Sequence, residues 1–159
     1  MKQYLFPAVE VLCVAALLVF IVFLCLSRSG GTEKPVDDLA APVLAQLKDG
    51  QMEKKTNADA AKTFGFDLSK ADGLVFCEDA DIMDVSELLI VKLKDADDAE
   101  EFRSAVEQHI ADRKNLYKNY APEQYALLGD SILETSGNTL FYCTAPNADR
   151  LYDAFRKAL

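Results

Sequence analysis

Residues 74–93, LVFCEDADIMDVSELLIVKL, contain two apolar runs separated by an acidic segment. The first run is Leu74–Cys77, which directly follows an Asp-Gly turn dipeptide, and the second run is Leu88–Leu93. The second run ends with apolar residues that alternate with lysines, which is the period-two pattern of a strand that buries one face. The stretch therefore predicts two β-strands joined by an acidic turn.

Five acidic residues crowd the turn between these strands: Glu78, Asp79, Asp81, Asp84 and Glu87. Carboxylates at this density are typical of Ca²⁺ ligands. A calcium loop that began at Asp79 would need glycine at its sixth position and glutamate at its twelfth, where this chain has Asp84 and Ile90. The pattern therefore indicates a solvated acidic turn, and we predict no metal site and no cofactor.

A long helix is predicted over Asp95–Tyr120, because apolar residues recur there at helical spacing. They are Ala99, Phe102, Val106, Ile110, Leu116, Tyr117 and Tyr120. His109 and Arg113 lie four residues apart beside this stripe and share one face of the helix. We expect their heads to meet carboxylates of the acidic turn, with a salt bridge from Arg113 to Glu87. The alternative is a ligand-binding face formed by His109, Arg113, Tyr117 and Tyr120.

Two helices are predicted before the first strand, one from Val36 to about Leu47 and a short one over Asn57–Phe64. After the long helix, Pro122 ends the helical pattern. Two further strands, Ile132–Thr135 and Thr139–Thr144, form a hairpin across a Ser-Gly-Asn turn.

A last helix is predicted over Ala148–Leu159. The expected order is thus α-α-β-β-α-β-β-α, an α+β fold. We expect an antiparallel sheet of about four strands with helices packed on one face.

Cys77 and Cys143 lie in the first and last predicted strands, where each alternates with an apolar residue on one face. If both faces meet the same core, the two thiols approach each other and a disulfide is open to them. The alternative is two free, buried thiols on strands that do not pair. A C-x-x-C motif is missing from the sequence, which argues against thiol redox chemistry.

The N-terminal stretch Leu5–Leu26 is apolar over 22 residues and carries one charge, Glu10. As a helix it would span ~33 Å, against ~30 Å for a bilayer's hydrocarbon core. We predict a single-pass transmembrane helix that serves as an uncleaved signal anchor. The domain organisation is then a tail over 1–4, the span over 5–26, a linker over 27–35 and an α+β domain over 36–159.

The domain is strongly acidic. Residues 31–159 hold 15 of the 17 basic and 25 of the 26 acidic residues, a net charge of −10, because only Lys2, Arg28 and Glu10 precede them. Such a domain repels nucleic acid and anionic headgroups, which excludes both as partners. Basic residues on the two sides of the span nearly balance, so charge alone leaves its orientation open.

Four motifs follow one another at spacings that resemble an uncharacterised bacterial family, domain of unknown function 4358. They are Phe64-Gly65-Phe66-Asp67, Ser86–Leu93, Tyr120-Ala121-Pro122-Glu123-Gln124 and Gly137-Asn138. The likeness covers about 36–159 and implies a small secreted or membrane-anchored protein with no established activity. It favours a cytoplasmic N-terminus and an extracytoplasmic domain. The family pattern has Arg and Gln eleven and seven residues before the Tyr of the third motif, where this chain has His109 and Arg113.

We recognise no catalytic constellation in the sequence. The leading expectation is a non-enzymatic, membrane-tethered, extracytoplasmic binding or interaction module of the bacterial cell envelope, with a protein or cell-wall partner. The alternative is a cell-envelope enzyme or small-ligand binder that uses the His109/Arg113 face.

Overall fold

The computed structural model describes residues 17–19, 31–47 and 52–159. Residues 17–19 are helical and belong to a unit over 1–30, while residues 31–159 form a second compact unit, the domain. The rest of the predicted transmembrane stretch 5–26 lies outside the described residues. Within the described ranges, no helix has the length and apolar character needed to cross a membrane.

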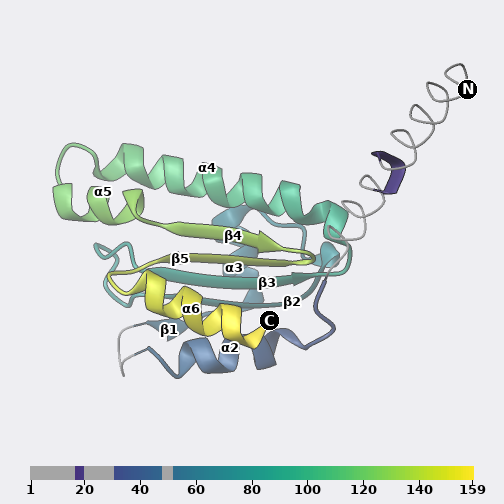
Figure 1. Cartoon of the computed structure of the whole chain (residues 1–159). Coiled ribbons are helices and arrows are strands. Elements are labelled where there is room, and N and C mark those ends of the chain that lie inside the picture. Colours follow the sequence, from purple (N-terminus) through teal and green to yellow (C-terminus); the bar gives the residue numbers. More distant parts are fainter. Residues whose placement is uncertain (1–16, 20–30, 48–51) are drawn as a thin grey trace, which may run out of the picture. The chain divides into compact units, whose positions relative to one another are not determined.

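The domain is built on one five-stranded antiparallel sheet with the strand order β1-β2-β3-β5-β4 (Figure 1). The strands are β1 (Glu53–Lys54), β2 (Ala71–Glu78), β3 (Glu87–Leu93), β4 (Ile132–Ser136) and β5 (Thr139–Thr144). Every residue of the central strand β3 is buried. The predicted α+β class and the antiparallel sheet are confirmed. The fifth strand, β1, is two polar residues long and has no hydrophobic period by which it could be predicted.

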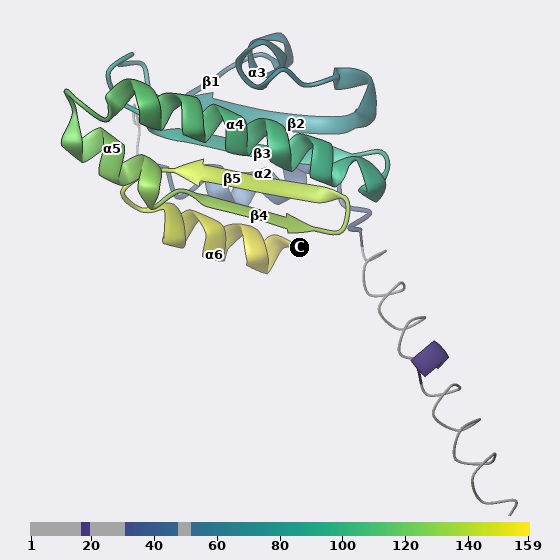
Figure 2. The ribbon, with the colours of Figure 1, turned by 90° about the horizontal axis from the view of Figure 1, so that it is seen from above.

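Five α-helices accompany the sheet. They are α2 (Val36–Leu44), α3 (Asn57–Phe64), α4 (Ala99–Tyr117), α5 (Pro122–Gly129) and α6 (Ala148–Ala158), with short 3₁₀ turns at Leu68–Lys70 and Ala96–Asp98. Helices α2 and α6 cover one face of the sheet, and α4 and α3 cover the other (Figure 1 and Figure 2). The prediction of helices on one face is therefore wrong.

Apolar side chains on both faces of the strands explain the second helical layer. In the three inner strands, Val75, Ile90 and Phe141 face α2 and α6. Their neighbours Phe76, Leu89 and Tyr142 face α3 and α4. An unbroken apolar run of this kind is typical of a strand that is buried on both sides.

Local sequence signals fix the ends of two helices. Thr56 and Asp59 form a capping box at the start of α3, and Gly65 ends that helix with a left-handed φ of 77°. Pro122 occupies the first turn of α5, where its missing N–H costs nothing. The predicted long helix thus stops at Tyr117, and α5, which the sequence analysis did not predict, follows as a separate helix.

The two ends of the sheet differ in what they carry. At one end, the hairpin end, Gly137 (φ 57°) allows the tight turn between β4 and β5. Residues 31–35 of the predicted linker lie at the same end. Lys92 Nζ donates a hydrogen bond to the Glu33 carbonyl over 3.2 Å, and Lys34 Nζ donates one to the Ala158 carbonyl.

At the other end, the loop end, residues 79–86 join β2 to β3 and lie against the C-terminus of α4 and against α5 (Figure 1). Val85, Tyr117 and Leu128 form a small separate core there.

Candidate functional site

Glu87, the first residue of β3, carries a buried carboxylate at the loop end. Its side chain is 3% exposed and shares a face with Leu89, so it points toward α4. A buried carboxylate costs free energy unless hydrogen bonds and an opposite charge compensate for its lost hydration. The Glu87 carboxylate therefore requires polar partners at its buried position on β3.

Three side chains supply those partners. Arg113 Nη1 forms an ion pair with Glu87 Oε1, so the predicted salt bridge is present. His109 Nε2 lies 2.8 Å from Oε2 of the same carboxylate. The Tyr142 hydroxyl, from the neighbouring strand β5, donates to Oε2 over 3.0 Å.

The hydrogen bonds continue from Tyr142 toward the surface. Thr144 Oγ1 donates to the Tyr142 hydroxyl over 2.9 Å, and Ser131 Oγ lies 2.6 Å from Thr144 Oγ1. We call these six residues, Glu87, His109, Arg113, Ser131, Tyr142 and Thr144, the Glu87 network. Burial raises the pKa of Tyr142 well above its ordinary value, and the adjacent Glu87 carboxylate raises it further.

Helix α4, which carries His109 and Arg113, also holds the β2–β3 loop against the domain. Arg113 Nη2 donates to the Asp84 carbonyl over 3.2 Å, and the Tyr117 hydroxyl donates to the Ile82 carbonyl over 3.2 Å. From α5, the Gln124 side-chain oxygen accepts the backbone N–H of Val85 over 3.0 Å. The loop is thus held at three points.

The acidic residues of the loop also organise it from within. Asp79, Asp81 and Asp84 each accept a backbone N–H two residues further on, over 2.8, 2.9 and 2.7 Å. Such local bonds are the reason that aspartate favours turns. The carboxylates whose density resembled a cation site therefore stabilise the turn of this loop.

Large hydrophobic side chains are exposed at this end of the domain. In the described part of the domain, five of the six such side chains lie on the loop, at the end of α4 or on α5: Ile82, Met83, Leu116, Tyr120 and Tyr125. The sixth is Leu159, at the end of the chain. Ile82 is 88% exposed, and Tyr120 is 53% exposed while its ring lies 5.4 Å from that of Tyr117. We call these five residues the apolar patch.

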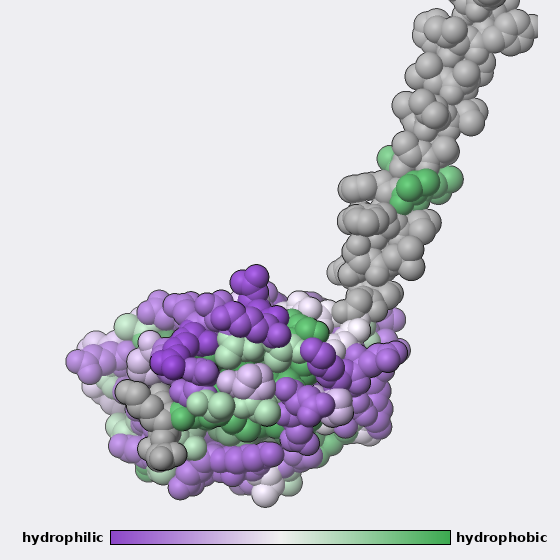
Figure 3. Space-filling model, turned by 60° about the horizontal axis from the view of Figure 1, so that its bottom comes forward, coloured by the Kyte–Doolittle hydropathy of each residue, from purple (hydrophilic) through white to green (hydrophobic). Residues whose placement is uncertain are grey.

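The α2–α6 side of the domain looks different. There, hydrophobic residues form a band between hydrophilic ones (Figure 3). The hydrophobic side chains that pack against the core of this side, among them Leu44, Leu47 and Tyr152, are partly buried. These side chains belong to the edge of the core, whereas those of the apolar patch are exposed on the surface.

The four residues predicted as a ligand-binding face do not share one open surface. His109 and Arg113 point inward to Glu87, and Tyr117 is 3% exposed. Of the four, Tyr120 is exposed and belongs to the apolar patch. The sequence analysis missed Ile82 and Met83, although an apolar pair in the middle of an acidic turn was a visible signal.

Tyr142 was not predicted as part of the site, because in the sequence it is one aromatic residue in a strand of apolar residues.

The two cysteines of the domain are free thiols. Cys77 on β2 pairs with Leu88 on β3, which in turn pairs with Cys143 on β5, so a whole strand separates the two. Two strand spacings amount to ~9–10 Å between Cα atoms, beyond the ~7 Å that a disulfide can bridge. The disulfide weighed above is therefore not formed. Burial raises the pKa of Cys143 to about 12 and also raises that of Cys77.

An open depression of about 430 Å³ lies beside α3, and none of the predicted ligand-binding residues lines it. Its walls are polar: Lys55, Asp59, Lys62, Thr63 and Glu78. Lys55 Nζ is 3.2 Å from Glu53 and 3.4 Å from Glu78, while Asp59 caps α3. These contacts give most of the lining residues a structural role.

Comparison with known proteins identifies a family and no individual relative. No curated protein and no solved structure matches the chain. Residues 45–145 match a family described as "Domain of unknown function (DUF4358)". This match spans β1 to the end of β5 and includes all six residues of the Glu87 network and all five of the apolar patch. The chain is therefore a member of the DUF4358 family.

Proposed function

We propose that this chain is a membrane-tethered interaction module of the bacterial cell envelope, which binds another protein through the apolar patch. The observation that carries the proposal is the gathering of exposed hydrophobic side chains at the loop end. Exposed hydrophobic side chains that gather at one end of a domain are a mark of a protein-binding site. Tyrosine and methionine, which supply three of the five side chains, are enriched in such interfaces.

The support beneath the patch favours binding without rearrangement. The carbonyl of Ile82 is held by Tyr117, and the loop is held again by Arg113 and Gln124. A surface that is already ordered loses little conformational entropy when a partner docks. Arg113 thus links the Glu87 network to the loop that presents Ile82 and Met83, because it bonds both Glu87 and the Asp84 carbonyl.

An enzyme or small-ligand binder that uses His109 and Arg113 is the weaker alternative. Both side chains are bonded to Glu87, which is 3% exposed. A ligand would have to draw both away at once and leave the buried carboxylate with Tyr142 as its remaining partner, at a cost of several kcal/mol, ~3–5. The open depression beside α3 does not include either residue.

The tether and its orientation rest on the sequence. The stretch over 5–26 has the length and apolar character of a transmembrane helix. We propose a cytoplasmic N-terminus and an extracytoplasmic domain. Protease added to intact spheroplasts should then degrade residues 31–159, whereas a cytoplasmic marker protein stays whole. A domain that survives until the membrane is opened places it inside and contradicts this orientation.

Site-specific photocrosslinking in living cells tests the binding role. A benzophenone amino acid in place of Ile82 or Tyr120 should give a discrete adduct upon irradiation. Replacement of Glu100 or Lys157, which are also exposed but lie toward the hairpin end, provides matched controls. The proposal predicts adducts at the first pair of positions and none at the second pair. Equal labelling at all four, or none at Ile82 and Tyr120, would falsify it.

A further inference from the structure

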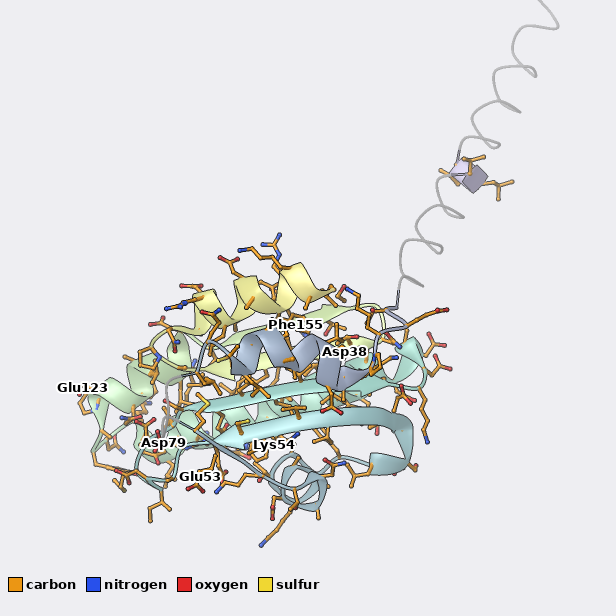
Figure 4. The ribbon with its side chains drawn as sticks, turned by 90° about the horizontal axis from the view of Figure 1, so that it is seen from below. Asp38, Glu53, Lys54, Asp79, Glu123 and Phe155 are labelled. Carbon is orange, nitrogen blue, oxygen red and sulfur yellow. The ribbon has the colours of Figure 1, made fainter. Side chains whose placement is uncertain are left out.

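Two of the three segments that carry the apolar patch, the loop and the α5 region, hold acidic residues and no lysine or arginine. Residues 78–91 contain five carboxylates and no lysine or arginine, and residues 119–131 contain Glu123 and Asp130 and again no basic residue. Figure 4 shows Asp79 and Glu123 toward one end of the domain and Asp38 toward the other. The third segment, the end of α4, carries Leu116 between Lys114 and Lys118, while Arg113 on the same helix is paired with Glu87.

The loop carboxylates are available to a partner as well as to their own backbone. In Asp79, Asp81 and Asp84, the bond to the loop backbone is made by Oδ1, and each carboxylate has a second oxygen. Asp81 is exposed and the other two are half-buried. Ile82 and Met83 sit between these carboxylates in the sequence, so any group that contacts the two apolar side chains also meets the negative charge.

We infer that the apolar patch takes a polypeptide segment in which lysine or arginine side chains accompany aliphatic or aromatic ones. This inference rests on the proposed function and specifies the chemistry of the partner. Cations of the segment pair with Asp79, Asp81, Asp84 and Glu123, and its apolar side chains pack on Ile82, Met83 and Tyr120. Complementary charge speeds encounter and sets the register of docking, while the apolar contacts hold the complex together.

Two other occupants fit the same surface less well. A second copy docked through this patch by a two-fold axis would place the acidic loop of one chain against that of the other. An anionic lipid surface would meet the same repulsion. A basic polypeptide that also carries apolar side chains is complementary to both the apolar and the acidic side chains of this surface.

The test uses the full chain in nanodiscs of zwitterionic phosphatidylcholine. A phage library of random 12-residue peptides is selected on these nanodiscs after depletion on empty ones. We expect the enriched peptides to carry net positive charge together with aliphatic or aromatic residues. The most enriched peptide, made synthetically, should bind at least tenfold more weakly when NaCl is raised from 50 to 500 mM, because salt screens exposed charges.

Variants then locate the binding and separate its two components. Ile82→Asp and Tyr120→Ala should each weaken binding of this peptide at least tenfold. Asp79→Asn/Asp81→Asn should weaken it at least threefold at low salt while the loop stays folded, because the asparagine oxygen can accept the same backbone N–H. The control variant Asp97→Asn/Glu100→Gln also removes two negative charges, but near the start of α4, at the hairpin end. It should change binding less than twofold. Circular dichroism checks that each variant is folded.

The outcomes separate the inference from the proposed function. Neutral or acidic peptides that still lose binding in Ile82→Asp would overturn the basic partner and leave a protein-binding patch in place. Peptides insensitive to both Ile82→Asp and Tyr120→Ala would overturn both. Self-association of the chain, or adhesion to phosphatidylglycerol vesicles, that is abolished by Ile82→Asp would assign the patch to a second copy or to lipid and overturn the inference.

Discussion

The carboxylate of Glu87 is the polar group on which the loop end of the domain depends most directly. It accepts from His109, Arg113 and Tyr142, which come from two different elements, α4 and β5. Loss of one partner from a buried, charged group costs more than loss of an ordinary surface contact. The effect of each partner can therefore be measured by removing it alone.

Arg113→Ala should lower the free energy of unfolding by about 1–3 kcal/mol. Its guanidinium bonds both Glu87 and the Asp84 carbonyl, so the variant loosens the carboxylate and the loop together. Urea denaturation of wild type and variant provides the measurement. Arg150→Ala, which removes an exposed arginine bonded to Gln46, serves as the control and should cost well under 1 kcal/mol, roughly 0.5. Equal losses in the two variants would mean that the ion pair of Arg113 with the buried Glu87 stabilises the domain no more than an exposed hydrogen bond does.

Tyr142 makes the stability of the domain sensitive to alkaline pH. Its folded-state pKa is raised by burial, so above pH ~10 the unfolded tyrosine loses its proton while the folded one keeps it. The folded state then binds more protons, and stability falls as pH rises, by about 1.4 kcal/mol per pH unit for this group. Urea denaturation between pH 9 and 11 should show a steeper loss for wild type than for Tyr142→Phe. The buried thiols contribute to both proteins alike, so identical slopes would refute the assignment to Tyr142.

The β2–β3 loop illustrates how an irregular element is held by the helices beside it. Its central residues belong to no strand or helix, and its order comes from Arg113, Tyr117 and Gln124 on the neighbouring helices together with its own aspartates. The contact from Gln124 is the most accessible to test, because it bonds a single backbone N–H of the buried residue Val85.

Gln124→Ala should speed hydrogen exchange at the Val85 amide. The lost acceptor is worth about 0.5–1.5 kcal/mol, which corresponds to roughly a twofold to twelvefold faster exchange if the opening is local. Residue-resolved exchange by NMR measures it. Gln108→Ala is the matched control, because Gln108 bonds the exposed Asp112 on the same helix and does not touch the loop. Unchanged protection at Val85 would show that the helices do not hold the loop through Gln124.

The predictability of each element follows from the length of its hydrophobic pattern. The runs Leu74–Cys77 and Leu88–Leu93 identified the two central strands, and the stripe from Ala99 to Tyr117 identified α4. The chain is apolar at every position from Leu74 to Cys77 and from Leu88 to Val91, a pattern that indicates two covered faces, yet alternation at Lys92 suggested one. Lys92 is in fact 8% exposed, because its charge is satisfied by Asp72 and the Glu33 carbonyl.

The candidate site was predictable in part. Spacing on α4 placed His109 and Arg113 on one face toward the acidic turn, and both do bond Glu87. Ile82 and Met83 could have been predicted as exposed from their place in an acidic turn, whereas the exposure of Tyr125 could not, because it depends on how α5 folds against α4. α5 was not predicted, because the apolar stripe continues to Tyr120, and Pro122, which ends that helical pattern, also stands in the first turn of α5.

At the scale of the whole molecule, the domain begins before its first helix. Glu33 and Lys34 bond Lys92 and the carbonyl of Ala158, so residues 31–35 are part of the packed unit. The acidic unit over 31–159 has its own core on both faces of the sheet. We expect it to fold without the residues that precede it.

A fragment over 31–159 should unfold in one cooperative thermal transition and sediment as a monomer. A fragment over 36–159 should be less stable by roughly 1 kcal/mol, because the buried Lys92 loses a carbonyl acceptor. Calorimetry on the two fragments measures the difference. Lack of a cooperative transition in the longer fragment would show that the first 30 residues complete the fold, and equal stability would assign no weight to the contacts of residues 31–35.

Residues 31–35 and the apolar patch lie at opposite ends of the sheet. The domain therefore holds the patch at a distance from the point where the chain enters it. The seven residues of β3 span ~23 Å at ~3.3 Å each, so the patch that we propose as the binding surface lies about one strand length from the point where the chain enters the domain. Attachment and recognition can then vary independently in evolution. Substitutions before residue 31 leave the patch intact, and substitutions in the loop leave the entry point intact. One recognition surface could thus be carried on unrelated anchors without being rebuilt.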